Sequence, residues 1–429
     1  MKTPQKSFYG MRRGLPPTHQ KNIESGIDIE GHLLVLKQLT EETTNPTNAH
    51  SIILQHIRST TIEYVDRVNS VYPVDLVIAI CYSADPESVK ILRAKGYDVY
   101  VPQSIDEMLN QLWKRVAEKA KSVSYPVVVQ EVGGYFADWT RELSAVPNFK
   151  GCVEDTANGL WRYQAAAAKK PLALPVISMA DTPLKHVEDA LIGDACVYSL
   201  EKVMRTQMAS ILEGVRCGVI GWGHIGKSAA AALAGRHAIV SIYDINPVVN
   251  MLAYAQGYYP MPLAQMMSDV DIIIGCSGRR SIRVADLDAL RNGIILCSGA
   301  SKNIEFDLEG FASVCDIQEI AADKPDRCAI QKYTVRKTGK WFYILDKGTP
   351  VDFLDMPLQG AILDCTCSEL FVCVRELVSK PHDPGIISLT DDLQMIVAKK
   401  WLRTHSEVFS TEDAKEDKVF FFPESWNWQ

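Results

Sequence analysis

The segment Cys217-Gly-Val-Ile-Gly-Trp-Gly-His-Ile-Gly226 decides the fold of the central part of the chain. Its first four residues predict a strand, and an alanine-rich helix is expected over 227–235. Glycines at these spacings allow a tight turn, close approach of the backbone to a pyrophosphate and close packing of the helix on the strand. Phosphates bind well at such a helix N-terminus. The residues expected to contact a dinucleotide here are Gly221, Gly223, His224, Ile225 and Gly226.

An acidic residue follows where the ribose of a dinucleotide would lie. Asp244 ends the next predicted strand, over 238–243. A carboxylate there accepts hydrogen bonds from the ribose hydroxyls and repels a 2′-phosphate, so NAD is expected rather than NADP. Further strands are expected over 271–275 and 294–297, and Ser277 and Gly278 are expected to line the cofactor site.

A second α/β unit is predicted upstream of this one. Val74–Ile80 and Tyr125–Gln130 are apolar runs typical of buried strands, and helices are predicted over 86–95 and 105–121. Apolar spacing also predicts a helix from His50 to Val68. Alternation of strands and helices indicates a parallel sheet covered on both faces, so the expected fold is α/β with two doubly wound, Rossmann-like sheets.

Composition excludes several classes of function. The 429 residues include 45 Lys and Arg against 52 Asp and Glu, a net charge of −7, so no nucleic acid or anionic membrane surface is expected as a partner. No apolar run is long enough to span a membrane. The polar N-terminus lacks an apolar leader, and the 11 cysteines are scattered, so we expect a cytoplasmic protein with reduced thiols and no metal site.

Two further segments carry a resemblance to a known family. Gly151-Cys-Val-Glu-Asp-Thr-Ala-Asn-Gly159 resembles the Gly-x-x-Glu-Glu-Thr-Thr-Thr-Gly segment of the adenosylhomocysteinase (S-adenosylhomocysteine hydrolase) family. Pro175-Val-Ile-Ser-Met-Ala-Asp181, continued through Lys185 and Asp189, resembles a second segment of that family. With the glycine loop, the similarity runs from about Cys81 to Cys373, and it identifies the chain as a divergent member.

The resemblance implies an NAD domain inserted into a substrate domain. The expected parts are a first part of the substrate domain at 1–190, the NAD domain at 191–351, a return segment at 352–402 and a C-terminal tail at 403–429. It also implies tightly held NAD that oxidises the ribose 3′-hydroxyl of a small nucleoside-like substrate, followed by elimination, addition of water and return of the hydride. A homo-oligomer, a dimer or a tetramer, is expected.

The catalytic and substrate residues follow from this resemblance, position by position. Lys185 and Asp189 match the lysine and aspartate that act at the 3′-hydroxyl, with Lys185 as base and Asp189 orienting it. Asp155 stands where the family has a ribose-binding glutamate, and together with Thr156 it is expected to hold a diol. Glu131 is a further candidate for substrate binding. Without the resemblance, Lys185 and Asp189 would be read as a surface ion pair and Asp155 as a helix cap.

Several departures put the elimination step in doubt. Val132, Ser301 and Gln359 stand where the family has an aspartate and two histidines. Glu131 precedes Val132, but strand alternation directs the two side chains to opposite faces. No clear counterpart of the N-terminal histidine motif is present, although His50 and His56 lie nearby. Because loss of one general acid or base typically costs a factor of about 10²–10⁴, slow hydrolysis is expected.

Three other interpretations stay open at this point. The chain could be an adenosylhomocysteinase with rearranged catalytic groups. It could be a non-catalytic NAD-binding protein kept for regulation. It could also be a 2-hydroxyacid dehydrogenase, for which Arg279 or Arg280 would supply the arginine, although no histidine follows in the later strands.

Overall fold

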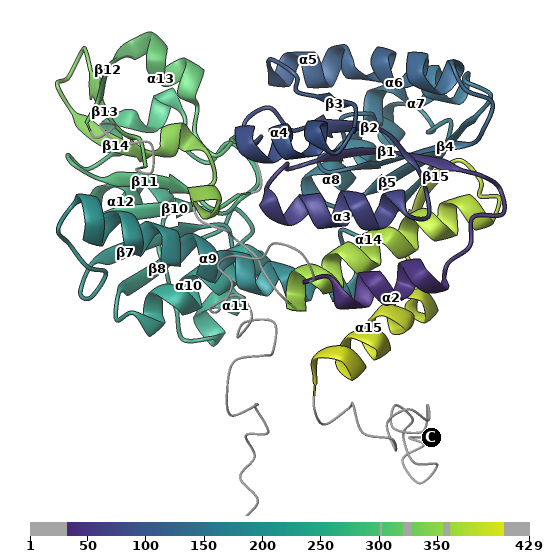
Figure 1. Ribbon diagram of the computed structural model, residues 1–429. Coiled ribbons are helices and arrows are strands. Elements are labelled where there is room, and N and C mark those ends of the chain that lie inside the picture. The colour runs from purple at the N-terminus through teal and green to yellow at the C-terminus, as the bar shows by residue number, and fades with distance from the viewer. Residues whose placement is uncertain (1–31, 301–302, 321–327, 355–360, 407–429) are drawn as a thin grey trace, which may run out of the picture. The chain divides into compact units, whose positions relative to one another are not determined.

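The computed structural model describes residues 32–300, 303–320, 328–354 and 361–406. The chain divides into two compact units, of which the first comprises 1–185 and 359–429 and the second 186–358. Each unit has its own β-sheet, and each is described separately below (Figure 1).

The sheet of the first unit is parallel at every described pairing. Its strand order is β15-β6-β5-β4-β1-β2-β3. The chain therefore builds outward from β1 to β3 on one side, and then from β4 on the other. Ligands of such sheets bind outside the carboxyl ends of the strands where this reversal occurs, here between β1 and β4. The strands are β1 (His50–Gln55), β2 (Val74–Ala79), β3 (Val99–Tyr100), β4 (Val127–Glu131), β5 (Phe149–Glu154), β6 (Pro175–Ser178) and β15 (Gly385–Ser388).

Successive residues of these strands enter two different hydrophobic cores. In β1, Ile53 packs into one core while Ile52 and Leu54 pack into the other, as the two-residue period of a strand requires. The first core includes α2 (Leu34–Glu42), α3 (Ser59–Asn69), α4 (Pro86–Ala94), α14 (Ala361–Ser379) and α15 (Asp391–His405). The other includes α5 (Ile105–Asn110), α6 (Leu112–Lys121), the 3₁₀-helix Ala137–Trp139, α7 (Thr140–Ser144) and α8 (Ala157–Lys169). Helices thus cover both faces of the sheet (Figure 1).

The helix predicted from His50 to Val68 is wrong in its first third. Residues His50–Gln55 form β1, and α3 begins only at Ser59. Ser51, Ile52, Ile53 and Leu54 are all fully buried, because both faces of this central strand are covered. A short run that is apolar on both faces carries no periodicity that distinguishes strand from helix.

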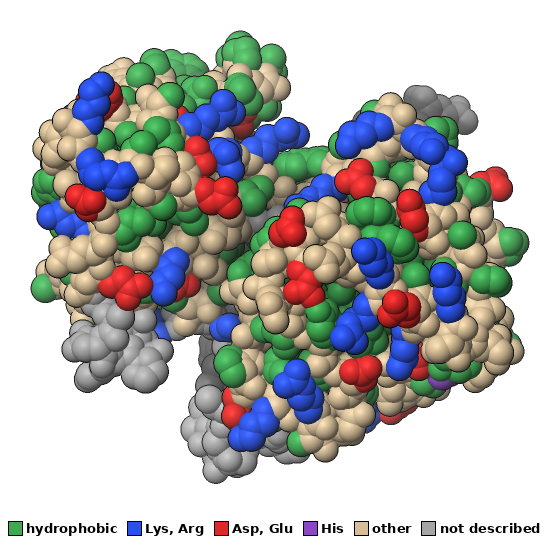
Figure 2. Space-filling view, turned by 90° about the horizontal axis from the view of Figure 1, so that it is seen from above, with side chains coloured by type: hydrophobic (Ala, Val, Ile, Leu, Met, Phe, Trp, Pro, Cys, Tyr) green, Lys and Arg blue, Asp and Glu red, His purple; other side chains and the backbone are tan. Residues whose placement is uncertain are grey.

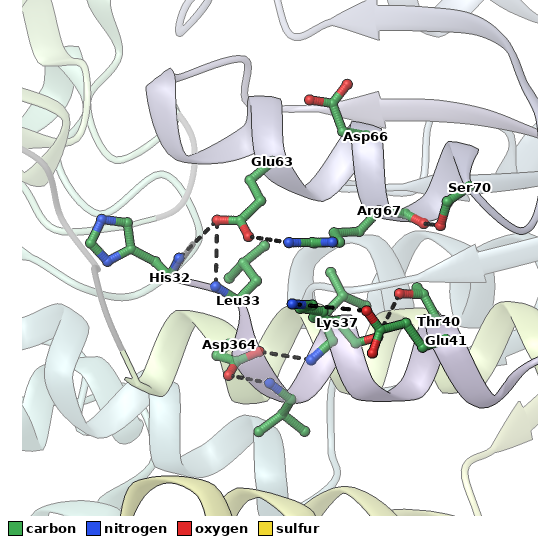
Figure 3. Close-up of polar contacts among 12 residues, drawn as sticks. His32, Leu33, Lys37, Thr40, Glu41, Glu63, Asp66, Arg67, Ser70 and Asp364 are labelled. Carbon is green, nitrogen blue, oxygen red and sulfur yellow. Dashed lines mark hydrogen bonds and ion pairs between the residues drawn. The ribbon is translucent and has the colours of Figure 1, made fainter. Parts of the chain in front are cut away.

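Helix α2 is capped by side chains from two other helices (Figure 3). A Glu63 oxygen, from α3, accepts hydrogen bonds from the backbone N–H groups of His32 and Leu33. Asp364, from α14, accepts from those of Val35 and Leu36 at 2.7 and 3.0 Å. The first N–H groups of a helix have no partner inside the helix, so these carboxylates satisfy donors that would otherwise be buried unpaired.

The sheet of the second unit has the order β12-β13-β14-β11-β10-β7-β8-β9. From β14 to β9 the pairings are parallel, and β12 and β13 add an antiparallel edge. The order reverses between β7 and β10, which marks the expected ligand position. The strands are β7 (Arg216–Ile220), β8 (Ile239–Tyr243), β9 (Tyr259–Pro260), β10 (Ile272–Gly275), β11 (Ile295–Ser298), β12 (Cys315–Glu319), β13 (Ile330–Val335) and β14 (Trp341–Leu345).

Helices also cover both faces of this sheet. One core includes α9 (Pro183–Gln207), α10 (His224–Gly235) and α11 (Pro247–Ala255). The other includes α12 (Leu263–Asp269), the 3₁₀-helix Val284–Ala289 and α13 (Leu308–Val314). Two more 3₁₀-helices, Asp346–Gly348 and Val351–Leu354, follow β14. The predicted α/β fold with two doubly wound sheets is confirmed, and the second sheet is mixed rather than purely parallel.

The surface carries charges of both signs. On the face seen in Figure 2, Lys and Arg side chains are interspersed with Asp and Glu. None of the helices in the described ranges combines the length and the apolar character needed to cross a lipid bilayer.

Candidate functional site

The carboxyl edge of the first sheet collects polar side chains from several neighbouring strands. His56 follows β1, Ser83 follows β2, Glu131 ends β4 and Asp155 follows β5. Because the strands are parallel and adjacent in the order β5-β4-β1-β2, these residues lie along one edge. The edge includes the position between β1 and β4 where the strand order reverses.

Lys185 and Asp155 form a nearly buried ion pair at this edge. Lys185 Nζ lies 2.8 Å from Asp155 Oδ1, and the two residues are only 7% and 8% exposed. The Thr182 hydroxyl accepts a hydrogen bond from the Lys185 N–H and donates one to Glu369 of α14. The lysine is thereby held in the first turn of α9 by a partner far away in sequence. The predicted diol residue Asp155 is thus the ion-pair partner of the predicted base, while Asp189 lies one helical turn later in α9.

Thr156 and Glu154 hold the turn on which Asp155 lies. The Thr156 hydroxyl accepts from the Gly159 N–H, which makes Thr156 the N-cap of α8, and it donates to Glu154. Glu154 also accepts from the backbone N–H groups of Gly133 and Gly134. A Cβ at Gly159 would lie 2.0 Å from the Glu154 carboxyl carbon, so only glycine fits there. The sequence analysis gave Glu154 no role, although it belongs to the quoted Gly151–Gly159 segment.

Glu131 is fully buried, and both of its oxygens meet protein donors. The Tyr163 hydroxyl donates to one and the Tyr135 N–H donates to the other. Burial, and then the negative charge of Glu154, raise the pKa of the Glu131 carboxyl to about 8. Its neighbour Val132 packs in the hydrophobic core. Glu131 is therefore a mostly neutral group at pH 7, engaged within the first unit.

The structure separates the two histidines near the first strand. His50 begins β1 and lies at the amino edge, where its ring stacks on Tyr125 and its Nδ1 lies 2.9 Å from Asp75. His56 follows β1 at the carboxyl edge, with its Nδ1 2.5 Å from the Ser83 hydroxyl oxygen. The sequence did not distinguish them, because the surroundings of neither histidine match the N-terminal histidine motif of the family. The signal that distinguishes His56 in the sequence is its position just after an apolar run.

The turn after β7 has the geometry that the glycine pattern predicts. Gly221 has a φ of +99°, in the left-handed region that favours glycine. A Cβ on Gly221 would lie 2.6 Å from the Cys276 carbonyl oxygen, and one on Gly226 would lie 1.9 Å from the Gly221 carbonyl oxygen. Gly223 faces open space, with no atom within 4 Å of its would-be Cβ. The structure therefore packs the first and third glycines tightly and leaves the second open for a ligand.

Asp244 and His224 lie around this turn. Asp244 Oδ2 accepts from the Trp222 N–H and Oδ1 from the Asn246 N–H, each at 2.9 Å. Asp244 thus faces the glycine turn, as a ribose ligand must. His224 begins α10 and stacks on His186 of α9, with ring centroids 3.9 Å apart, and Ile225 follows half-buried.

The turn after β10 contains the remaining predicted cofactor residues. The Ser277 hydroxyl and the Gly278 N–H donate to the two oxygens of Glu305, which is fully buried. Burial raises the pKa of the Glu305 carboxyl to about 7. Glu305 was not predicted as a site residue, because a single glutamate after a strand has no distinguishing sequence pattern.

Two predicted departures, Ser301 and Gln359, lie outside the described residues. Within the residues that are described, no group of three or more His, Cys, Asp or Glu side chains could hold a metal ion.

Comparison with known proteins agrees with this geometry. Residues 194–353 match the family model described as the NAD-binding domain of S-adenosyl-L-homocysteine hydrolase. The adenosylhomocysteinase of Thermotoga maritima is 26% identical over 328 residues, which cover 74% of this chain and 77% of that protein. The chain is therefore similar to adenosylhomocysteinases over most of its length. The predicted resemblance and the predicted cofactor, NAD, are confirmed.

Two solved structures match the chain at lower similarity. A phosphoglycerate oxidoreductase of Vibrio cholerae has a TM-score of 0.37 and 13% identity over 58% of this chain and 75% of that one. A transhydrogenase of Sinorhizobium meliloti has a TM-score of 0.36 and 14% identity over 77% of this chain and 96% of that one.

Proposed function

We propose that this adenosylhomocysteinase relative is an enzyme that uses NAD to oxidise, at least transiently, a hydroxyl of a nucleoside or similar ribosyl substrate. The observation that carries the proposal is the ion pair of Lys185 with Asp155 at the carboxyl edge of the first sheet. Surface ion pairs contribute little and are usually solvated, whereas this one is nearly buried at the edge where ligands of such sheets bind.

The chain's own residues would handle the proton and the orientation of the substrate. NAD, when bound to the second unit, supplies the hydride acceptor for an alcohol. In its neutral amine form Lys185 takes the hydroxyl proton and becomes the ammonium, and it returns this proton when the ketone is reduced again. Asp155 fixes the Lys185 ammonium and has lone pairs left to accept a hydrogen bond from the second hydroxyl of a diol. Oxidation is balanced in this way: the carbon loses a hydride and the oxygen loses a proton.

The test is whether a nucleoside reduces the bound cofactor. NAD-loaded protein mixed with adenosine should develop the absorbance band of reduced nicotinamide. Lys185→Ala should bind NAD as before but lose reduction by at least about a hundredfold, because general-base groups typically contribute this much. Lys169→Ala is the matched control, since Lys169 forms an exposed pair with Asp138. If no nucleoside or sugar in a broad panel reduces NAD that is bound, the regulatory interpretation replaces this one.

A second candidate function is hydrolysis of S-adenosylhomocysteine itself. His56 favours this function, because an imidazole at the end of β1 can serve as an acid or base. Val132 counts against it, because valine stands where the family has an ionisable aspartate. We expect cleavage to be very slow. Incubation of NAD-loaded protein with S-adenosylhomocysteine and a thiol reagent measures it. Turnover near one per second, within the ordinary range of enzymes, would establish the hydrolase, and His56→Asn should then abolish it.

A further inference from the structure

The Glu305 carboxylate accepts hydrogen bonds from two groups of the turn after β10. The Gly278 N–H donates to Oε1 at 2.7 Å and the Ser277 hydroxyl to Oε2 at 2.9 Å. A Cβ on Gly275, the last residue of β10, would lie 2.7 Å from Glu305 Oε2, so the carboxylate lies directly against the strand end. The Glu305 backbone is anchored as well, because its carbonyl oxygen accepts from the Ser281 N–H at 2.8 Å.

This turn is also in contact with the glycine turn after β7. The Cys276 N–H donates to the Ile220 carbonyl at 2.8 Å. The would-be Cβ of Gly221 lies within 2.9 Å of Ser277 Cα as well as of the Cys276 carbonyl. A shift of Cys276–Gly278 would therefore displace the first glycine of the dinucleotide motif. The two turns follow the neighbouring strands β7 and β10, between which the strand order reverses.

We propose that Glu305 is a positioning residue for the cofactor, and that its ionised form holds the Cys276–Gly278 turn in the shape that binds NAD. The inference rests on NAD binding to this unit and extends it to a residue without an assigned role.

The hydroxyl of Ser277 shows how a proton on Glu305 would change the turn. Ser277 Oγ lies 2.9 Å both from Glu305 Oε2 and from the Arg279 carbonyl oxygen, but it has a single proton to donate. An ionised Glu305 only accepts, so it draws this proton and the Gly278 N–H toward itself. A neutral Glu305 carries a donor of its own, which leaves the Ser277 proton to the Arg279 carbonyl and weakens the hold on the turn. Hydrogen bonds to a charged group are the stronger ones.

The titration of Glu305 falls in a measurable range. Burial raises the pKa of its carboxyl to about 7, and hydrogen bonds from the surrounding serine and glycine groups oppose the rise. Burial, and then the charge of Glu305, raise the pKa of the neighbouring Cys276 thiol well above its usual value, so that thiol stays neutral. Arg280, which follows this turn, is paired with Asp307 at 3.2 Å. His224, the first residue of α10, stacks on His186 of α9 with ring centroids 3.9 Å apart.

The experiment measures NAD affinity between pH 5.5 and 8.5 for the natural chain and for Glu305→Gln. If the neutral form binds NAD as weakly as Glu305→Gln does, the affinity of the natural chain should fall below pH 7 toward that of the variant, by about tenfold in all. Glu305→Gln should bind about tenfold more weakly at pH 8, and its affinity relative to the natural chain should recover as the pH falls. Both proteins carry His186 and His224, so the ratio of the two affinities removes the histidine contribution.

Matched variants separate this role from a general structural one. Glu309→Gln changes an exposed carboxylate four residues later and should follow the natural chain at every pH. Ser277→Ala should weaken NAD binding at pH 8 and reduce the dependence of the affinity on pH. This variant tests the inference if Glu305→Gln does not fold. Equal affinity of Glu305→Gln and the natural chain at pH 8 would overturn the inference. Failure of the natural chain to bind NAD would instead overturn the cofactor assignment.

Discussion

Asp244 lies half-buried at the end of β8 and accepts one backbone hydrogen bond on each carboxylate oxygen, from Trp222 and from Asn246. A carboxylate oxygen can accept about two hydrogen bonds, so each retains capacity for a ribose hydroxyl. Glu131 and Glu305 are also carboxylates near strand ends, but burial has made each of them harder to ionise. We therefore propose recognition of the ribose for Asp244 and control of a turn for Glu305.

Asp244→Ala should weaken NAD binding and narrow the preference over NADP. The natural carboxylate accepts a hydrogen bond from the 2′-hydroxyl of NAD and repels the 2′-phosphate of NADP. Its removal therefore weakens NAD binding and relieves the repulsion of NADP. Affinities of both cofactors, measured by titration of the natural chain and the variant, check this. Asp269→Ala is the control, because Asp269 is a half-buried carboxylate at the end of α12 in the same unit, outside the glycine turn. Equal affinity of the natural chain for NAD and NADP would show that Asp244 is not the ribose ligand.

Glu131→Gln should change how stability depends on pH. The pKa of Glu131 is about 8 in the folded chain against an ordinary 4.5, so the folded state holds a proton that the unfolded state has lost between these values. The contribution of Glu131 to the free energy of unfolding is therefore complete below pH 4.5. It is lost as the pH rises through 8, by at most about 1.4 kcal/mol per pH unit.

Glutamine cannot ionise, so the thermal midpoint of Glu131→Gln relative to the natural chain should rise between pH 5 and 8 and then level off. Glu142→Gln, at an exposed position, provides the baseline. A constant difference across this range would mean that Glu131 is ionised in the folded chain.

For single residues, the sequence predicted only those features that belong to a local pattern. The glycine turn and Asp244 were predicted as cofactor residues because their spacing along the chain is itself the signal. The pairing of Lys185 with Asp155 joins residues thirty positions apart, on a helix and on a strand end, so it depends on the strand order. The family resemblance supplied both residues but assigned the orienting role to Asp189.

At the scale of elements, tertiary contacts fix what local sequence leaves open. Helix α2 begins without a capping side chain of its own, and carboxylates from α3 and α14 replace it (Figure 3). Its cap residues lie more than 300 positions apart from α14 in the sequence, so no local pattern could predict this start. The incorrect helix prediction over β1 also has a tertiary cause. Both faces of this strand are buried, so its residues lack the polar–apolar alternation that identifies a strand.

Asp364→Ala should loosen the start of α2 and destabilise the first unit. The variant leaves the buried N–H groups of Val35 and Leu36 unpaired, at a cost of about 1–3 kcal/mol each. Hydrogen exchange of these two amides, together with the thermal midpoint, measures the effect. Glu41→Ala, in the exposed pair with Lys37, should change stability by less than about 0.5 kcal/mol. Unchanged protection of Val35 and Leu36 would contradict the capping role of Asp364.

At the scale of the whole molecule, two doubly wound sheets each present a reversal of strand order with functional groups at the carboxyl ends. In the first unit the reversal lies between β1 and β4, close to His56, and in the second between β7 and β10, at the glycine turn. Alternating strands and helices in the sequence predicted this architecture. The antiparallel edge of the second sheet adds two strands beyond the doubly wound part and leaves the reversal unchanged.

Native mass spectrometry of the purified chain, before and after addition of adenosine, tests whether the chain oxidises a ribosyl hydroxyl with its bound NAD. We expect bound NAD before the addition. After it, we expect NADH together with a nucleoside two hydrogen atoms lighter, and Lys185→Ala should retain NAD unchanged. Bound NAD that stays oxidised with adenosine and with a panel of other ribosyl compounds would contradict the claim.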